Sequence, residues 1–379
     1  MSRHTRSIAL AAAGLAALAC AAPATAQSAS SRLAGGGLFE SYTFAEPSAT
    51  GIENITLLTT PYALRLGLGS RVTVSVGGAY ATGKLTRADG SESELSGPTD
   101  TRVSMSLALI PDGITLTGFF VAPTGESTHD ADQAAVAGAV AADLLPFRIT
   151  NWGSGGGAGM QLTGTRRFQN FGAGLSVGYR QSNEFEPVDG NEVNYRPGDE
   201  VRVRLALDTE FDNNAKGSLV VGLQRFGEDA FNESNLFQSG NRVEVTGTLA
   251  FPIGYRASGA LYGSVLHRAN GQFFPDAAGV FELAEEESPT QDLLLFGGIL
   301  RRAVGSAFVV PRADFRLFRS EDGRGQGYTG SVGLSFELGG DGVTFTPTFA
   351  GRFGSIEILE GAESSFTGFE AGATIRFGR

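Results

Sequence analysis

The stretch "FTGFEAGATIRFGR", residues 366–379, stands at the end of the sequence and decides how the rest is interpreted. Every second residue from Thr367 to Phe377 is mostly apolar, whereas the residues between them are small, polar or charged. A period of two is the signature of a β-strand with two unlike faces. The fold therefore depends on what the apolar face contacts, which is either the core of a soluble sandwich or lipid.

The same alternation recurs along the chain, for example in "VRVRLALD" (201–208), "NRVEVTGTLAF" (241–251) and "SVGLSFEL" (331–338). It predicts about sixteen strands, within a range of roughly 14–18. We expect them near residues 33–44, 54–68, 71–81, 99–110, 112–122, 156–168, 170–181, 197–210, 215–226, 237–251, 255–269, 289–304, 306–320, 326–338, 342–354 and 364–378. Most exceed the roughly 5–6 residues of soluble strands and reach the roughly 9–11 that a tilted strand needs to cross a bilayer.

The connections between these strands alternate between short turns and long polar links. The short turns are expected at 67–70, 110–113, 167–170, 212–214, 251–254, 303–306 and 339–342, and the long links near 45–53, 82–98, 123–155, 182–196, 227–236, 270–288, 321–325 and 355–363. Bacterial outer-membrane barrels have short periplasmic turns, long extracellular loops and an even number of strands. Charges on one strand face also argue against a sandwich, whose inner face is dry. We therefore predict an all-β fold, a transmembrane antiparallel up-and-down β-barrel, with a soluble sandwich as the alternative.

Composition agrees with this class of protein. The chain has 379 residues, of which 54 are glycine and 18% are charged, and its mean hydropathy is -0.01. So much glycine argues against a helical bundle, and a mean hydropathy near zero suits a chain that alternates apolar and polar residues. The net charge of -11 argues against nucleic acid as a partner, because phosphate binding needs a basic surface.

The first residues have the features of a secretory signal peptide. Basic residues precede the apolar run 8–22, and Ala24-Thr25-Ala26 is a small-x-small cleavage site. We predict that residues 1–26 are removed and that residues 27–379 form one barrel domain in a Gram-negative outer membrane. The only cysteine, Cys20, lies in this segment, so a lipoprotein is the alternative. Expected partners are outer-membrane lipid and lipopolysaccharide, the barrel-assembly machinery and a small-molecule solute, and the oligomeric state stays open.

Two resemblances support an outer-membrane barrel. The terminal segment resembles the C-terminal assembly signal of such barrels, with Glu370, Gly372, Ile375 and Phe377 at the matching positions, although Gly378 and Arg379 follow the terminal aromatic residue. The second lies in "GPTDTRVSMSLALIPDGITLTGFFVAPTGEST" (97–128), where Gly97, Asp100, Pro123, Thr124 and Gly125 fit a Gly-x-x-Asp entry and a Pro-Thr-Gly exit. This segment resembles the outer-membrane transporter family associated with the phenol meta-degradation pathway. The resemblance implies a transport role and fixes no substrate.

Strand periodicity places a set of charged residues on the polar face, which would surround the lumen of a barrel. They are Arg102, Arg180, Arg202, Arg204, Asp208, Arg242, Glu244, Arg256, Arg312, Asp314, Arg316, Glu337, Arg352, Glu370 and Arg376. One interpretation is a selective constriction, because rings of charged side chains set the selectivity of pores. The other is a set of structural ladders in which arginines pair with acidic residues on neighbouring strands.

Residues outside the strands leave further alternatives open. The longest loop, 123–155, contains the Ala-rich segment "DADQAAVAGAVAADLL" (130–145), which predicts a short helix folded either into the lumen or over the barrel mouth. Acidic residues gather in other long links and either bind divalent cations or are simply solvated. Aromatic residues near strand ends either form membrane girdles or pack in a core. This last group comprises Tyr42, Tyr80, Phe119, Phe120, Tyr179, Phe251, Phe315, Phe336 and Phe377.

We expect no enzyme, no catalytic residue, no metal site and no cofactor. His129 and His267 are the only histidines beyond the predicted signal peptide, and nothing near them in sequence marks a nucleophile. The sequence thus predicts a porin-like channel or facilitated transporter that passes small polar, anionic or aromatic solutes by passive diffusion through an Arg-lined lumen. The alternative function is a non-conducting structural or adhesive barrel.

Overall fold

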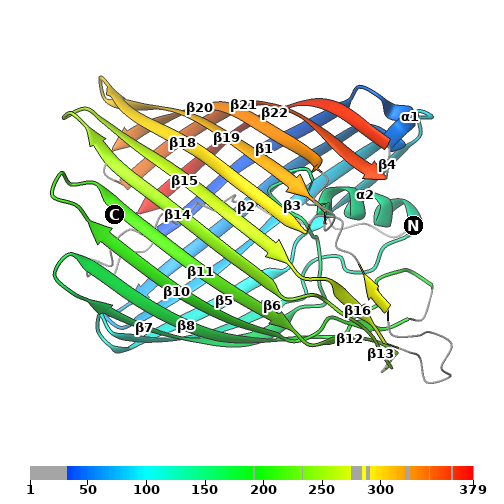
Figure 1. Cartoon of the computed structure of the whole chain (residues 1–379), viewed down its shortest axis with the longest axis horizontal. Coiled ribbons are helices and arrows are strands. Elements are labelled where there is room, and N and C mark those ends of the chain that lie inside the picture. Colours follow the sequence, from blue (N-terminus) through cyan, green and yellow to red (C-terminus); the bar gives the residue numbers. More distant parts are fainter. Residues whose placement is uncertain are drawn as a thin grey trace, which may run out of the picture.

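The chain forms a closed antiparallel β-barrel (Figure 1). The computed structural model describes residues 32–142, 144–190, 193–232, 234–274, 284–286, 291–320, 325–340, 342–359 and 362–378. The main sheet has 17 strands, of which β4 and β5 both pair with β3 and are two pieces of one wall strand, so the wall has 16. The barrel closes where β1 pairs with β22. The predicted all-β fold, an antiparallel up-and-down barrel of about sixteen strands, is confirmed. The predicted signal peptide lies outside the described residues.

The strands follow one another around the wall in chain order. Their bounds are β1 Arg32–Phe44, β2 Ile52–Leu68, β3 Val72–Arg87, β4 Glu92–Pro98, β5 Thr101–Ile110, β6 Ile114–Ala122, β7 Gly157–Arg167, β8 Phe171–Ser182, β10 Glu200–Glu210, β11 Lys216–Phe226, β14 Arg242–Ile253, β15 Ala257–Arg268, β18 Asp292–Val304, β19 Ala307–Arg319, β20 Gly325–Gly340, β21 Gly342–Leu359 and β22 Ala362–Gly378. Each wall strand pairs antiparallel with its two neighbours, which is the up-and-down arrangement expected from the alternating connections.

Short and long connections lie at opposite ends of the barrel. The turns at one end, such as 69–71, 111–113 and 305–306, have one to five residues. The other end carries α1 (Pro47–Thr50), α2 (Ala131–Ala141) and a small sheet. That sheet, which the sequence did not predict, consists of β9 Tyr195–Arg196, β12 Glu228–Phe231, β13 Ser234–Gln238, β16 Gly271–Phe273 and β17 Ala284–Glu286. Among the described residues, neither helix is long and apolar enough to span a membrane.

The two faces of the wall differ as the alternation predicts. Large apolar side chains such as Phe296, Val332 and Phe349 are more than half exposed on the outer face. On the other face, Glu40 and Glu370 are buried and lie directly opposite each other across the closing pair of strands. A period of two thus separates an apolar outside from a polar inside around the barrel.

Four details differ from the sequence predictions. The links 82–98 and 355–363 are largely strand, because β3–β4 and β21–β22 continue as hairpins. Asp89-Gly90 makes the first of these turns, with Gly90 at φ 82, a conformation that glycine adopts without strain. Arg256 lies in the turn after β14 rather than on a wall strand. Tyr42 is completely buried on the inner face, and Phe119 lies under the Arg102 guanidinium, so neither belongs to an outer aromatic girdle.

Candidate functional site

The long loop between β6 and β7, residues 123–156, lies inside the barrel against one side of its wall. Val136 and Val140 of α2 are fully buried in a cluster with wall residues that include Leu57 and Leu95. Gly83 on β3 makes room for the loop, because a Cβ there would lie 2.9 Å from the Trp152 ring and 3.0 Å from the Val136 side chain. The loop therefore occupies part of the lumen near the long-loop end (Figure 1).

Local sequence explains why a helix forms within this loop. Alanine has the highest helix propensity, and Ala131–Ala141 is rich in it. Asp130 and Gln133 form a capping box, in which the Gln133 backbone N–H donates to Asp130 Oδ1 at 2.8 Å and the Asp130 N–H donates to Gln133 Oε1 at 3.1 Å. Asp132 accepts hydrogen bonds from Ser93 and Arg87, which lower the pKa of its carboxyl group and tie the helix to the β3–β4 hairpin.

A single carboxylate holds both ends of the loop. Asp100 Oδ1 accepts from the Gly125 N–H at 3.1 Å, and Oδ2 accepts from the N–H and the hydroxyl of Ser154, both at 2.8 Å. The Thr124 hydroxyl donates to the Thr99 carbonyl at 3.0 Å and accepts from the Thr101 N–H at 2.9 Å. These bonds join the entry and the exit of the loop at the break between β4 and β5.

We call the hydrogen bonds of Asp100 to Gly125 and Ser154 the clasp. The glycines next to it allow the two ends of the loop to approach each other closely. A Cβ at Gly125 would lie 1.9 Å from the Trp152 carbonyl oxygen, and one at Gly153 would lie 2.6 Å from the Glu126 carbonyl oxygen. Any side chain at either position would force the two ends of the loop apart. Trp152 adds an anchor, because its indole N–H donates to the Ala81 carbonyl at 3.2 Å.

Replacing Asp100 with alanine is expected to loosen the loop, because three charge-assisted hydrogen bonds are lost and their donors are left without an acceptor. We expect a local destabilisation of about 2–3 kcal/mol. Trp152 is the only tryptophan and is 1% exposed, so its fluorescence should shift to longer wavelength and become quenchable by acrylamide. Asp212→Ala, on an exposed short turn, is the matched control. An emission spectrum identical to that of the control would show that Asp100 does not hold the loop in place.

Five charged side chains link the loop to the closing strands. Glu370 contacts Arg312 at 2.7 Å, Arg148 at 3.5 Å and also Arg352, while Glu40 contacts Arg352 at 3.1 Å. The Arg148 backbone N–H donates to Glu40 Oε2 at 3.1 Å, and Arg352 donates to the Pro146 carbonyl at 3.0 Å and to the Tyr42 hydroxyl. The carboxylates of Glu40 and Glu370 are fully buried, so the arginines compensate their charge.

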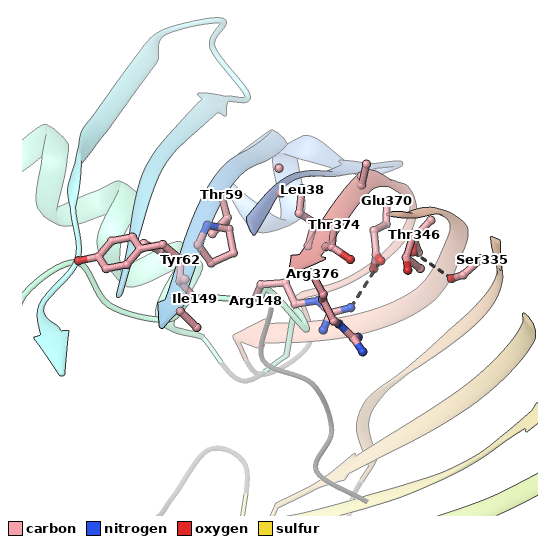
Figure 2. A pocket seen from close by; sticks show the side chains of 18 of the residues that line it. Leu38, Thr59, Tyr62, Arg148, Ile149, Ser335, Thr346, Glu370, Thr374 and Arg376 are labelled. Carbon is pink, nitrogen blue, oxygen red and sulfur yellow. Dashed lines mark hydrogen bonds and ion pairs between the residues drawn. The ribbon is translucent and has the colours of Figure 1, made fainter. Parts of the chain in front are cut away.

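A cavity of about 460 Å³ lies between this cluster and the inner wall below the loop. Figure 2 shows Arg148 and Ile149 of the loop lining it together with Glu370, Thr374 and Arg376 of β22. Hydroxyl groups from Thr59, Ser335, Thr346 and Thr348 and apolar side chains such as Leu38 and Val310 complete the lining. The cavity thus offers both polar and apolar contacts.

The predicted polar-face residues fall into two groups. Most of those on β18–β22 are tied in ion pairs or hydrogen bonds: Arg312 and Arg352 with Glu370, Glu337 with Arg301, and Asp314 with the Ser331 hydroxyl. Arg376 of β22 instead lines the cavity with no ion pair among the described residues. The others lie on β5, β8, β10 and β14 across the barrel. In this group Arg102 stacks on Phe119 at 3.9 Å, Arg242 on Phe226 at 4.9 Å, and Arg202 pairs with Glu200 at 2.5 Å.

The remaining predicted residues have these neighbours. Glu244 accepts a hydrogen bond from the Thr246 hydroxyl at 3.2 Å. In register, Arg180 faces Glu200, Arg204 faces Gly222 and Asp208 faces Gly172.

Of the assembly-signal residues, Glu370 and Gly372 point inward, whereas Ile375 and Phe377 are exposed on the outer face. The sequence did not single out Glu40 or Arg148; only the alternation of β1 could have indicated Glu40.

The histidines do not join a nucleophile in the described part of the chain. His267 lies on the outer face of β15 and contacts Asp292 at 2.8 Å. His129 lies in the loop and forms an isolated bridge with Val188, and burial lowers the pKa of its imidazole. Within the described residues, no group of three or more His, Cys, Asp or Glu side chains could hold a metal ion.

Comparisons with known proteins add a distant structural likeness. No family model and no curated protein sequence matches the chain, so the resemblance to the transporter family stays a prediction. Solved structures of mutants of the Rhodopseudomonas blastica porin are similar over 92% of this chain and 100% of theirs. One is 15% identical and a triple mutant is 14% identical, both with a TM-score of 0.42. With so low an identity and TM-score, the likeness carries no conclusion about this chain. Its own geometry defines a sixteen-stranded closed barrel with an inserted loop.

Proposed function

We propose that the protein is a porin-like channel of the outer membrane that passes small polar and anionic solutes by passive diffusion. The observation that supports this most directly is the loop 123–156, which Asp100 holds at both ends and which packs on one side of the inner wall. A loop fixed in this way narrows a lumen without filling the opposite side. Permeation then requires no catalytic step.

The outer surface supports a membrane location. Its large exposed side chains are apolar over most of the wall, and the uninterrupted wall strands have 9 to 18 residues. A closed barrel satisfies its backbone hydrogen bonds internally, so it can enter lipid where an open sheet cannot. The short-turn end would face the periplasm and the long-loop end the exterior.

The distribution of charge supports a preference for anions. The arginines on β18–β22 are largely compensated by Glu337, Glu370 and Glu40, whereas β5, β8 and β10 carry Arg102, Arg180, Arg202 and Arg204 on their inner face. On these three strands Glu200 and Asp208 provide partial compensation. Solutes passing between the loop and this side would experience a positive potential, which favours anions.

Replacing Arg180 and Arg204 together with glutamine is expected to shift the reversal potential in a KCl gradient toward cation preference. Two positive charges leave the side of the lumen that the loop does not cover, and the effect should weaken at high salt because screening increases. Planar-bilayer recording measures this, and Arg302→Gln on the outer face is the control. A wild-type barrel that inserts and never conducts would favour the non-conducting structural barrel instead.

A further inference from the structure

A second hollow lies on the inner wall nearer the short-turn end, where β1, β2, β3 and β5 run side by side. It has a volume of about 470 Å³. Register places its small residues in two parallel rows, with Ala34, Ala63 and Gly77 in one and Ser75 and Ser104 in the other. These small side chains form the floor of what we call the basic depression. Arg32, Arg65 and Arg102 also line it.

The rows end on arginines. Across the strands, Arg376, Ala34, Ala63, Gly77 and Arg102 are successive register partners. The adjacent row runs Arg32, Arg65, Ser75 and Ser104 in the same way. Strands lie about 4.8 Å apart and residues about 3.3 Å apart along a strand. Arg65 and Arg102 are two strand spacings and two residues apart, so their backbones are separated by roughly 12 Å along the wall. Both residues line the depression, on either side of the same few small residues.

The charge of the basic depression is not compensated by its own lining. All the residues that line it are among those the structure describes, and none of them is acidic. Within the described residues, Arg65 and Arg376 make no hydrogen bond or ion pair. Arg102 stacks on the Phe119 ring at 3.9 Å and interacts electrostatically with Arg180, Arg202 and Glu200. Like charges held this close repel one another, and a bound anion of more than one charge relieves that repulsion more than a monovalent one.

We propose that the basic depression is a binding site for multivalent oxyanions, of which phosphate and pyrophosphate are representative. The planar guanidinium groups of Arg65 and Arg102 match two oxygens of a tetrahedral oxyanion, and Ser75 and Ser104 add hydroxyl donors between them. Arg376, in register with Ala34, strengthens the field at the far edge. The inference that these anions are also transported rests on the proposed channel function. Their binding at the basic depression does not depend on it.

Isothermal titration of the detergent-solubilised barrel with inorganic phosphate and pyrophosphate tests the site directly. We expect binding of both, tightest for pyrophosphate, with acetate much weaker. Arg65→Gln and Arg102→Gln should each weaken phosphate binding about tenfold, because one charge-assisted contact is lost. Arg167→Gln is the matched control, since Arg167 is an exposed arginine at the short-turn end of β7. Heat-modifiable gel migration confirms that each variant is folded.

A second measurement separates this proposal from the channel function. Phosphate added to the KCl bath should reduce the current of the wild-type channel, and Arg65→Gln should remove that block. Binding without conductance would overturn the channel and leave the site intact. Conductance with no phosphate binding, or binding that Arg65→Gln and Arg102→Gln leave unchanged, would overturn the site. Equal affinity for acetate and phosphate would contradict the preference for multivalent oxyanions.

Discussion

Replacing Val136 and Val140 with aspartate is expected to expel the loop from the inner wall and to increase the conductance of the channel. Both valines are fully buried against wall residues such as Leu57 and Leu95. Each substitution removes about 1.5–3 kcal/mol of apolar burial and places a carboxylate where it has no partner, at a further cost of several kcal/mol. The combined free-energy cost of the two substitutions exceeds the stabilisation that the hydrogen bonds of Asp100 provide, so α2 should leave its position.

The size of the increase follows from geometry. Sixteen strands about 4.8 Å apart and tilted by about 40° form a backbone ring about 32 Å across, which leaves a lumen of roughly 20 Å once side chains are included. A helix with its side chains is about 10 Å wide and so fills about a quarter of that cross-section. Removing it should raise the single-channel conductance by about a third, or more if the rest of the loop follows.

The matched control for this pair is Gly138→Asp. Gly138 lies on the exposed side of the same helix, and nothing lies within 4 Å of a Cβ built there. The control adds the same carboxylate without disturbing the packing, so its conductance and its Trp152 emission should match wild type. A double variant with red-shifted Trp152 emission and unchanged conductance would show that the loop does not restrict the lumen. Deleting residues 130–145 should give the same increase by an independent route.

The barrel could be predicted from sequence because each wall strand repeats the same simple rule. In "VRVRLALD" the two faces differ at every position, and Val201 and Leu205 are exposed on the outer face as the alternation indicates. The rule fails where the inner face is apolar too. On β3 and β4, Leu85 and Leu95 point inward to receive the loop, so the contrast between faces weakens and residues 82–98 look like a link.

The site could be predicted only in fragments, because its contacts join residues far apart in sequence. Asp100 and Gly125 stood out as landmarks of a resemblance, and the structure supplies a physical reason for both. Ser154, the third member of the clasp, lies 54 residues from Asp100 and has no local signal. Arg65 could have been predicted: in "YALRLGLG" (62–69) leucines alternate with small residues and this one arginine, which places Arg65 on the inner face with Thr59 and Ala63.

Replacing Glu370 with glutamine is expected to lower the free energy of unfolding by about 3 kcal/mol, which is typical when one member of a buried ion cluster is removed. The Glu370 side chain is fully buried and contacts Arg148, Arg312 and Arg352. An amide would keep one acceptor and turn two donor hydrogens toward guanidinium groups. Equilibrium unfolding in urea, with the barrel in phospholipid vesicles, measures the change.

Glu337→Gln is the control that distinguishes burial from charge pairing. Glu337 lies on β20 and contacts Arg301 at 2.7 Å, but its side chain is 32% exposed, so its loss should cost less than about 1 kcal/mol. The contrast matters because Glu40 and Glu370 face each other across β1 and β22, the one strand pair that closes the barrel. Arg352 contacts both carboxylates, so without it their repulsion would act at the seam itself. Equal costs for Glu370→Gln and Glu337→Gln would show that the cluster does not hold this seam.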